Sequence, residues 1–148
     1  MQELVEQLVK QKREGDWWDF KKQHHSNLHD LLHDLLCLAN IIYDEDRFII
    51  FGVSDDYEIT GLSENDVRYT QADIFNFLRS KSFAYHKIPN VKLDSILIRL
   101  NKSGIFVYKG IHFVSVLLSK SDRNVWKGKA AFTKAVFVVN NVSARSHT

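Results

Sequence analysis

Apolar positions recur with helical spacing in three stretches of the chain. In residues 2–13 they fall on one face, and acidic residues precede basic ones, as the helix dipole favours. Residues 27–41 carry a wide leucine stripe behind an asparagine, a favourable helix N-cap, and predict the main core helix. Thr70-x-x-Asp73 has the pattern of a capping box and predicts a further buried helix that ends near Arg79.

Strand patterns lie between and after these helices. Residues 48–53 form an apolar run too short for a helix, which predicts a strand buried on both faces at the centre of the sheet. Trp18 and Phe20 alternate with Asp19 and Lys21, so an acid and a base project from one face of a neighbouring strand. Further apolar runs predict a strand or hairpin return at 57–62, and strands at 91–100, 105–108, 111–118 and 135–139.

These elements together predict an α+β fold. It comprises a mixed β-sheet of about five or six strands packed with two main helices plus an N-terminal helix. The length of 148 residues suits a single domain over 1–148. No apolar run is long enough to span a membrane, and the start lacks the order of a signal peptide. A single Cys37 inside an apolar run predicts a core thiol and a cytoplasmic protein.

Charge is distributed unevenly between the two halves of the chain. Residues 1–80 contain 8 Lys and Arg against 16 Asp and Glu, whereas residues 81–148 contain 12 against 2. Clustered basic residues with few acids bind phosphates, so the second half is suited to a nucleic acid. Alternatively, the basic half neutralises the acidic half by packing beside it. Composition leaves both readings open.

Acidic residues also follow the central strand. Ser54, Asp55 and Asp56 stand where that strand ends, which favours a turn, because acidic and hydroxyl side chains cap and redirect the backbone there. The same place at the end of a buried strand is suited to catalytic or metal-binding carboxylates. The residues alone do not separate these two interpretations.

Three short motifs stand in order between residues 14 and 62. They are Glu14 followed after four residues by Asp19-Phe20-Lys21, then Leu38-Ala39-Asn40 at a helix end, and then Gly52-Val53 with Asp55-Asp56 and Gly61. In this arrangement the chain resembles the Schlafen-type AlbA domain, a module associated with nucleic-acid binding in Schlafen proteins and many bacterial proteins. Asp19 stands where that family has Glu.

The resemblance implies an activity and a site. Some Schlafen proteins are metal-dependent endoribonucleases that act on tRNA and rRNA through three carboxylates. Carried over by position, these are Glu14, Asp19 and either Asp55 or Asp56, which would hold Mg²⁺ or Mn²⁺. Lys21 would then neutralise the scissile phosphate.

The resemblance also implies partners. The ligand would be a nucleic acid, RNA rather than DNA, and two lobes are paired in the nuclease Schlafens, so a homodimer would rebuild their groove. A non-catalytic DNA- or RNA-binding module of a regulatory or defence protein is the alternative. The basic side chains expected to hold the flanking backbone are Lys22, Arg79, Lys81, Lys120, Arg123, Lys127 and Lys129.

Overall fold

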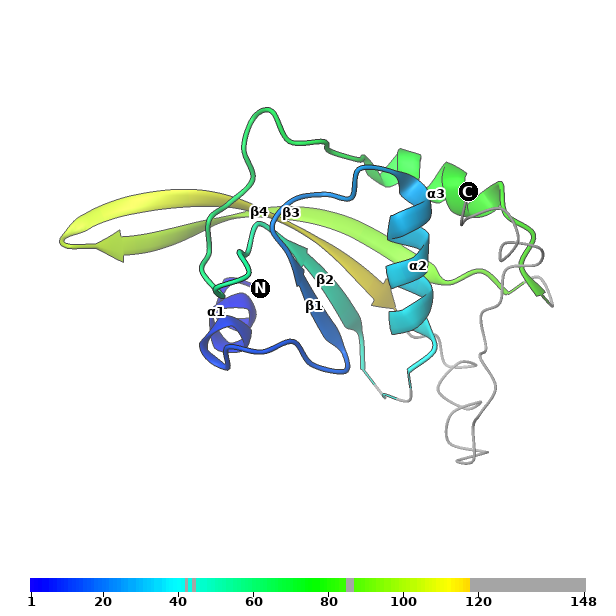
Figure 1. The fold of residues 1–148 in the computed structure, drawn as a ribbon, viewed down its shortest axis with the longest axis horizontal. Coiled ribbons are helices and arrows are strands. Elements are labelled where there is room, and N and C mark those ends of the chain that lie inside the picture. The colour runs from blue at the N-terminus through cyan, green and yellow to red at the C-terminus, as the bar shows by residue number, and fades with distance from the viewer. Residues whose placement is uncertain (42, 44, 85–86, 118–148) are drawn as a thin grey trace.

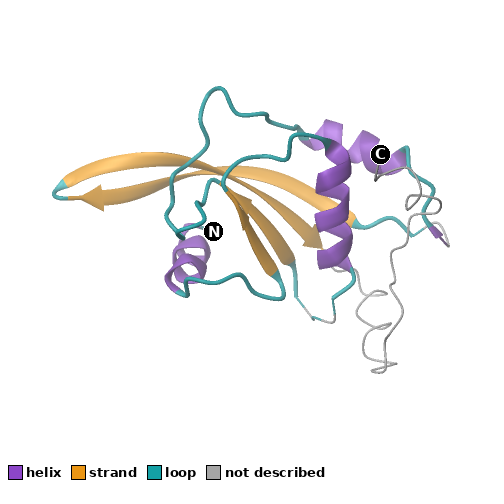
Figure 2. Ribbon diagram, viewed as in Figure 1, coloured by secondary structure: helices purple, strands orange, loops and turns teal. Residues whose placement is uncertain are grey.

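A computed structural model of the chain describes residues 1–41, 43, 45–84 and 87–117. In these residues three helices accompany one four-stranded mixed sheet (Figure 1, Figure 2). The elements follow the order α1 (Gln2–Lys10), β1 (Trp18–Lys21), α2 (Leu28–Ala39), β2 (Arg47–Phe51), α3 (Gln71–Arg79), β3 (Asn90–Lys102) and β4 (Ile105–Leu117). The predicted α+β class and the three helices are confirmed.

The sheet has the strand order β1-β2-β4-β3. β1 pairs with β2 in parallel, β2 pairs with β4 antiparallel, and β3 and β4 form one long antiparallel hairpin. β2 is an internal strand and is buried over most of its length, as its apolar run predicts. It ends at Phe51 because Gly52 takes a φ of 109°, a conformation that residues with a Cβ rarely adopt.

Local signals in the sequence explain where the helices begin. The Asn27 side chain accepts a hydrogen bond from the Asp30 backbone N–H at the start of α2. At α3, Thr70 and Asp73 form the predicted capping box, in which each side chain accepts from the backbone N–H of the other residue.

Apolar side chains form two separate cores, one on each face of the sheet. Helices α2 and α3 cover one face, where their leucines pack against Ile49, Phe51 and Val114. Helix α1 covers the other face, where Val5 and Leu8 pack with the ring of Trp18 and other residues. The alternation along β2 therefore sends Ile49 and Ile50 into different cores.

The number of strands differs from the prediction. The described residues contain four strands rather than about five or six. Residues 57–62 form only an isolated bridge between Val53 and Ile59, because the Thr60 and Gly61 N–H groups both donate to the Gly52 carbonyl. The run 105–108 and the described part of the run 111–118 belong to one strand, β4, since Gly110 pairs with Leu97 inside the ladder. The run 135–139 lies outside the described residues.

One buried charge ties the connection after α2 to the sheet. Arg47 at the start of β2 is 0% exposed. Its Nη2 donates to the carbonyl oxygens of Ile41 and Tyr43, each at 2.9 Å. A guanidinium with two backbone acceptors fixes the position of that segment, because each lost hydrogen bond would leave a buried polar group unsatisfied.

Within the described part of the chain, no helix is long and apolar enough to cross a membrane. The prediction for Cys37 was wrong, since this residue is exposed on α2 rather than buried in the core. It lies beside the leucine stripe rather than within it.

Candidate functional site

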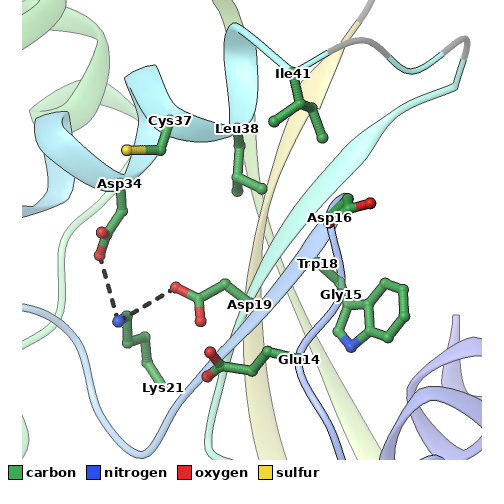
Figure 3. A pocket seen from close by; sticks show the side chains of 10 residues that line it. All are labelled: Glu14, Gly15, Asp16, Trp18, Asp19, Lys21, Asp34, Cys37, Leu38 and Ile41. Atoms are coloured by element: carbon green, nitrogen blue, oxygen red, sulfur yellow. Dashed lines mark ion pairs between the residues drawn. The ribbon is translucent and has the colours of Figure 1, made fainter.

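The polar face of β1 lies opposite helix α2. Trp18 and Phe20 are buried in the core with α1, so the two-residue period of the strand turns Asp19 and Lys21 toward α2. The Lys21 Nζ lies 3.2 Å from an Asp19 carboxylate oxygen and 3.5 Å from a carboxylate oxygen of Asp34 on α2 (Figure 3). One ammonium group therefore bridges the strand and the helix.

These side chains line an open pocket of about 300 Å³ between β1 and α2. Figure 3 shows the carboxyl groups of Glu14 and Asp19 directed toward the same space, with Asp34 and Lys21 beside them. The full lining consists of Glu14, Gly15, Asp16, Trp18, Asp19, Lys21, Asp34, Cys37, Leu38 and Ile41.

Gly15 allows the connection between α1 and β1 to fold against the strand. Its backbone N–H donates to the Trp18 carbonyl at 3.3 Å, and the Trp18 ring occupies the space that a Cβ at position 15 would need. The lack of a side chain at this position lets the indole ring lie against the backbone. Glu14, one residue earlier, is thereby held next to Asp19.

Glu14 and Asp19 behave as a carboxyl pair. Burial raises the pKa of Glu14, and the hydrogen bond its protonated form donates to Asp19, together with the Asp19 charge, raises it further. The Lys21 charge and the Phe20 backbone N–H act in the opposite direction but are weaker. A pair of this kind holds a proton that a cation can replace.

Asp34 has the opposite character. Burial alone would raise its pKa, but the hydrogen bond from His25 and the positive charge of Lys21 outweigh burial and lower it. The His25 Nε2 lies 2.5 Å from the Asp34 Oδ2. Asp34 is therefore ionised and holds Lys21 over the pocket. Burial lowers the pKa of Lys21, but Asp19 and Asp34 together raise it, so its ammonium stays charged.

The surroundings of Cys37 disfavour a nucleophilic role for its thiol. Burial and the charges of Asp34 and Asp19 all raise the pKa of its thiol. The reactive form of cysteine is the thiolate, which this acidic setting disfavours. The chemistry of the pocket belongs to its carboxylates and its lysine.

The structure brings together some of the predicted site residues and separates others. Glu14, Asp19 and Lys21 share the pocket. Asp55 and Asp56 are exposed in the turn after β2 and do not line it. In that turn the Tyr57 N–H donates to the Ser54 carbonyl at 2.9 Å, which is the turn geometry expected for an acidic strand exit.

Asp34 and His25 were not among the predicted site residues. Asp34 interrupts the leucine stripe of α2 within the repeated sequence His29-Asp-Leu-Leu-His33-Asp-Leu-Leu. The position of Asp34 at the border of the apolar face is the feature of the sequence that could have marked it as a site residue. Without the packing of α2 across β1, that feature could not identify a partner for Lys21.

The described residues of the pocket offer few protein ligands to a divalent metal ion. Among the described residues, no group of three or more His, Cys, Asp or Glu side chains is arranged to hold one. Mg²⁺, however, is commonly held by one or two carboxylates together with water and substrate phosphate oxygens. The hydrogen-bonded pair of Glu14 and Asp19 supplies two such hard oxygen ligands in an open pocket, and fits a cation of this class.

The predicted basic residues are spread over several elements. Lys22 is exposed directly after β1. Arg79 lies 5.0 Å from the centre of the Phe75 ring, and the Lys81 Nζ lies 4.7 Å from the centre of the Phe77 ring. The other four predicted residues, Lys120, Arg123, Lys127 and Lys129, lie outside the described residues.

Comparison with protein families gives one match. The family model described as Schlafen, AlbA_2 matches residues 14–137, which includes every described residue of the pocket. No curated protein matches the chain.

Proposed function

The chain belongs to the Schlafen AlbA_2 family, and on this premise we propose that it binds RNA and cleaves the phosphodiester backbone in the pocket between β1 and α2. The family relation suggests a nucleic-acid-related function. The observation that carries the proposal is the pairing of the Glu14 and Asp19 carboxyl groups in an open pocket beside a charged lysine.

Four charged residues of the pocket have a role in this proposal. Glu14 and Asp19 would hold Mg²⁺ or Mn²⁺, which supplies a Lewis acid for the negative charge that develops on the phosphate. Lys21 orients a non-bridging phosphate oxygen through its ammonium group. Asp34, held in turn by His25, keeps that ammonium above the pocket.

The decisive test is cleavage of tRNA by the purified chain with Mn²⁺ at low salt. We expect Asp19→Asn to reduce the rate by about 10²-fold or more, because it weakens binding of the cation that would stabilise the negative charge on the reacting phosphate. Glu64→Gln is the matched control, since Glu64 is exposed and does not line the pocket. Intact tRNA, or an Asp19→Asn variant that cleaves as fast as the unmodified chain, would refute cleavage at this site.

Two further variants identify the third carboxylate. If Asp34 supports the site, Asp34→Asn should slow cleavage and Asp55→Asn should not, because only Asp34 lines the pocket. The reverse pattern would place Asp55 in the reacting complex.

A second function is favoured by the ion pairs of Lys21. Its ammonium already neutralises Asp19 and Asp34, so the pocket contains its own counter-ion. Under this alternative the domain binds RNA without cutting it. Binding that weakens steeply with salt while the RNA stays intact in Mn²⁺ would support it, since phosphate neutralisation requires such a salt dependence.

A further inference from the structure

The hairpin of β3 and β4 extends well beyond the rest of the sheet. β2 pairs with β4 only from His112 to Val116, so within the described residues no third strand lies beside residues 105–111 of β4 and their partners in β3. Figure 1 shows this part of the hairpin projecting away from α2 and α3. One of its faces continues the face that α2 and α3 cover nearer the centre of the sheet.

Side-chain alternation identifies the residues on that uncovered face. Val91 and Leu93 of β3 point into the core under α2 and α3, so Leu97 and Arg99 lie on the same side further out. Their neighbours on β4 at this side include Phe106 and Tyr108, which pair with Asn101 and Arg99. Leu97, Phe106 and Tyr108 are 68%, 54% and 61% exposed.

Two aromatic rings and a cation therefore stand in a row. Phe106 and Tyr108 are two residues apart on one strand, which separates them by about 7 Å. The Arg99 guanidinium lies 4.6 Å from the centre of the Phe106 ring. At the base of the row, Arg68, Leu97, Gly110 and His112 help to line a hollow of about 250 Å³.

Charge distinguishes the type of partner that this face can accept. β3 and β4 together contain four basic residues and one acidic residue. The acidic residue, Asp94, lies on the opposite face and pairs with Lys92 at 3.5 Å. An exposed aromatic row bordered by arginines and free of carboxylates on its own strands is complementary to a polyanion with flat apolar groups.

We propose that this face of the β3–β4 hairpin binds single-stranded nucleic acid, with unpaired bases stacked on Phe106 and Tyr108 and phosphates held by Arg99 and Arg68. The inference rests on the proposed action on nucleic acid but places binding at a surface separate from the pocket. Every base has a π-face, so such a surface accepts a single strand with little sequence preference. In a duplex the bases are paired and stacked on one another, and the rings cannot reach them.

The test compares a labelled single-stranded RNA with the duplex of the same sequence, in EDTA so that the strand stays intact. We expect Phe106→Ala and Tyr108→Ala each to weaken single-strand binding about fivefold or more, with little change for the duplex. Tyr108→Phe should bind nearly as well as the unmodified chain, because it keeps the ring. Arg99→Gln should also reduce the slope of log affinity against log salt by about one, whereas the ring variants should not.

Phe75→Ala is the matched control. Phe75 is 48% exposed on α3 and has its own stacked arginine, Arg79, at 5.0 Å. The Phe75→Ala substitution therefore removes a similarly exposed ring and its cation–π contact at another surface. Equal binding by all the ring variants and the unmodified chain would overturn the inference.

The outcomes also separate this inference from the proposed cleavage. Weaker single-strand binding by the ring variants supports the hairpin site even if no RNA is cleaved. Unchanged binding together with cleavage in Mn²⁺ overturns the hairpin site and leaves cleavage standing. A chain that binds no single strand overturns the hairpin site, and cleavage is then decided by the tRNA test in Mn²⁺. A dimer that dissociates in Phe106→Ala, without any effect on RNA binding, would identify a second copy as the occupant and overturn the inference.

Discussion

Glu14 is a residue of the pocket whose charged form is disfavoured by its surroundings, which raise its pKa. Burial and the neighbouring Asp19 both favour its protonated state. A binding site often keeps groups in arrangements that lower stability when no ligand is present. The cost at Glu14 should therefore be measurable in the folding of the chain itself.

We predict that Glu14→Gln raises the free energy of unfolding at pH 7 by up to about 1 kcal/mol, a limit suited to a partly exposed group. Because the folded-state pKa of Glu14 is raised, the stability contributed by its protonated form is lost as pH rises through that pKa. Glutamine does not ionise and therefore avoids this loss of stability. Urea unfolding at several pH values measures the difference, which should shrink in acid. Glu64→Gln is the control. A Glu14→Gln variant less stable than the unmodified chain at pH 7 would contradict the prediction.

At the scale of single elements, the connection between α1 and β1 determines where Glu14 lies. The Trp18 ring fills the space next to Gly15, so the backbone of this connection packs against a core side chain. A change here should act on the pocket through the loop, without altering any charged residue.

We predict that Gly15→Ala lowers the free energy of unfolding by about 1–3 kcal/mol, the usual cost of overpacking, and weakens Mn²⁺ binding by displacing Glu14. Gly110→Ala is the matched control, because a Cβ there meets no atom within 4 Å. Urea unfolding and a Mn²⁺ titration measure the two effects. If both alanine variants behave alike, the packing of Gly15 against Trp18 does not position the pocket.

Elements with strong local signals were predictable from the sequence. The caps at Asn27 and Thr70 fixed the starts of α2 and α3, and the alternation in β1 correctly placed Asp19 and Lys21 on one face. Lys109 and Gly110 separate the predicted strands 105–108 and 111–118, but they lie inside β4, because Asn101–Gly104 already reverses the chain.

The rest of the pocket depends on tertiary packing. Asp34 joins Lys21 only because α2 crosses β1, and Cys37 is exposed because it lies beside the leucine stripe rather than within it. Neither the contact between Asp34 and Lys21 nor the exposure of Cys37 can be predicted from the local spacing of residues. The family resemblance placed Glu14 and Asp19 in one site, where they do lie together, whereas Asp55 and Asp56 lie in a separate turn.

At the scale of the whole molecule, a histidine pair connects the segment after β1 with the hairpin. His24 is 3% exposed, stacks on Phe51 at 4.2 Å, and has its Nε2 3.0 Å from the Nδ1 of His112 on β4. Burial lowers the pKa of His24 to about 4, and the charges of His112, His25 and Arg68 act in the same direction. The fold therefore requires this imidazole to be neutral.

We predict that the chain loses stability as pH falls from about 6.5 to 4, by on the order of 1 kcal/mol per pH unit. The unfolded chain binds a proton at His24 over this range and the folded chain does not. His24→Phe keeps a ring against Phe51 and should flatten the pH dependence, whereas His29→Gln, on the exposed face of α2, should not. Thermal unfolding across the range tests this, and an equally steep loss in His24→Phe would reject His24 as the cause.

The buried guanidinium of Arg47 has a consequence for reading natural variation in this chain. Position 47 is distant in sequence from every acidic residue of the pocket, yet Arg47 holds the carbonyl of Ile41, which forms part of the pocket wall. A missense change at this codon would alter the shape of the pocket while leaving each of its carboxylates in place. An inventory restricted to the acidic motif would classify such an allele as harmless.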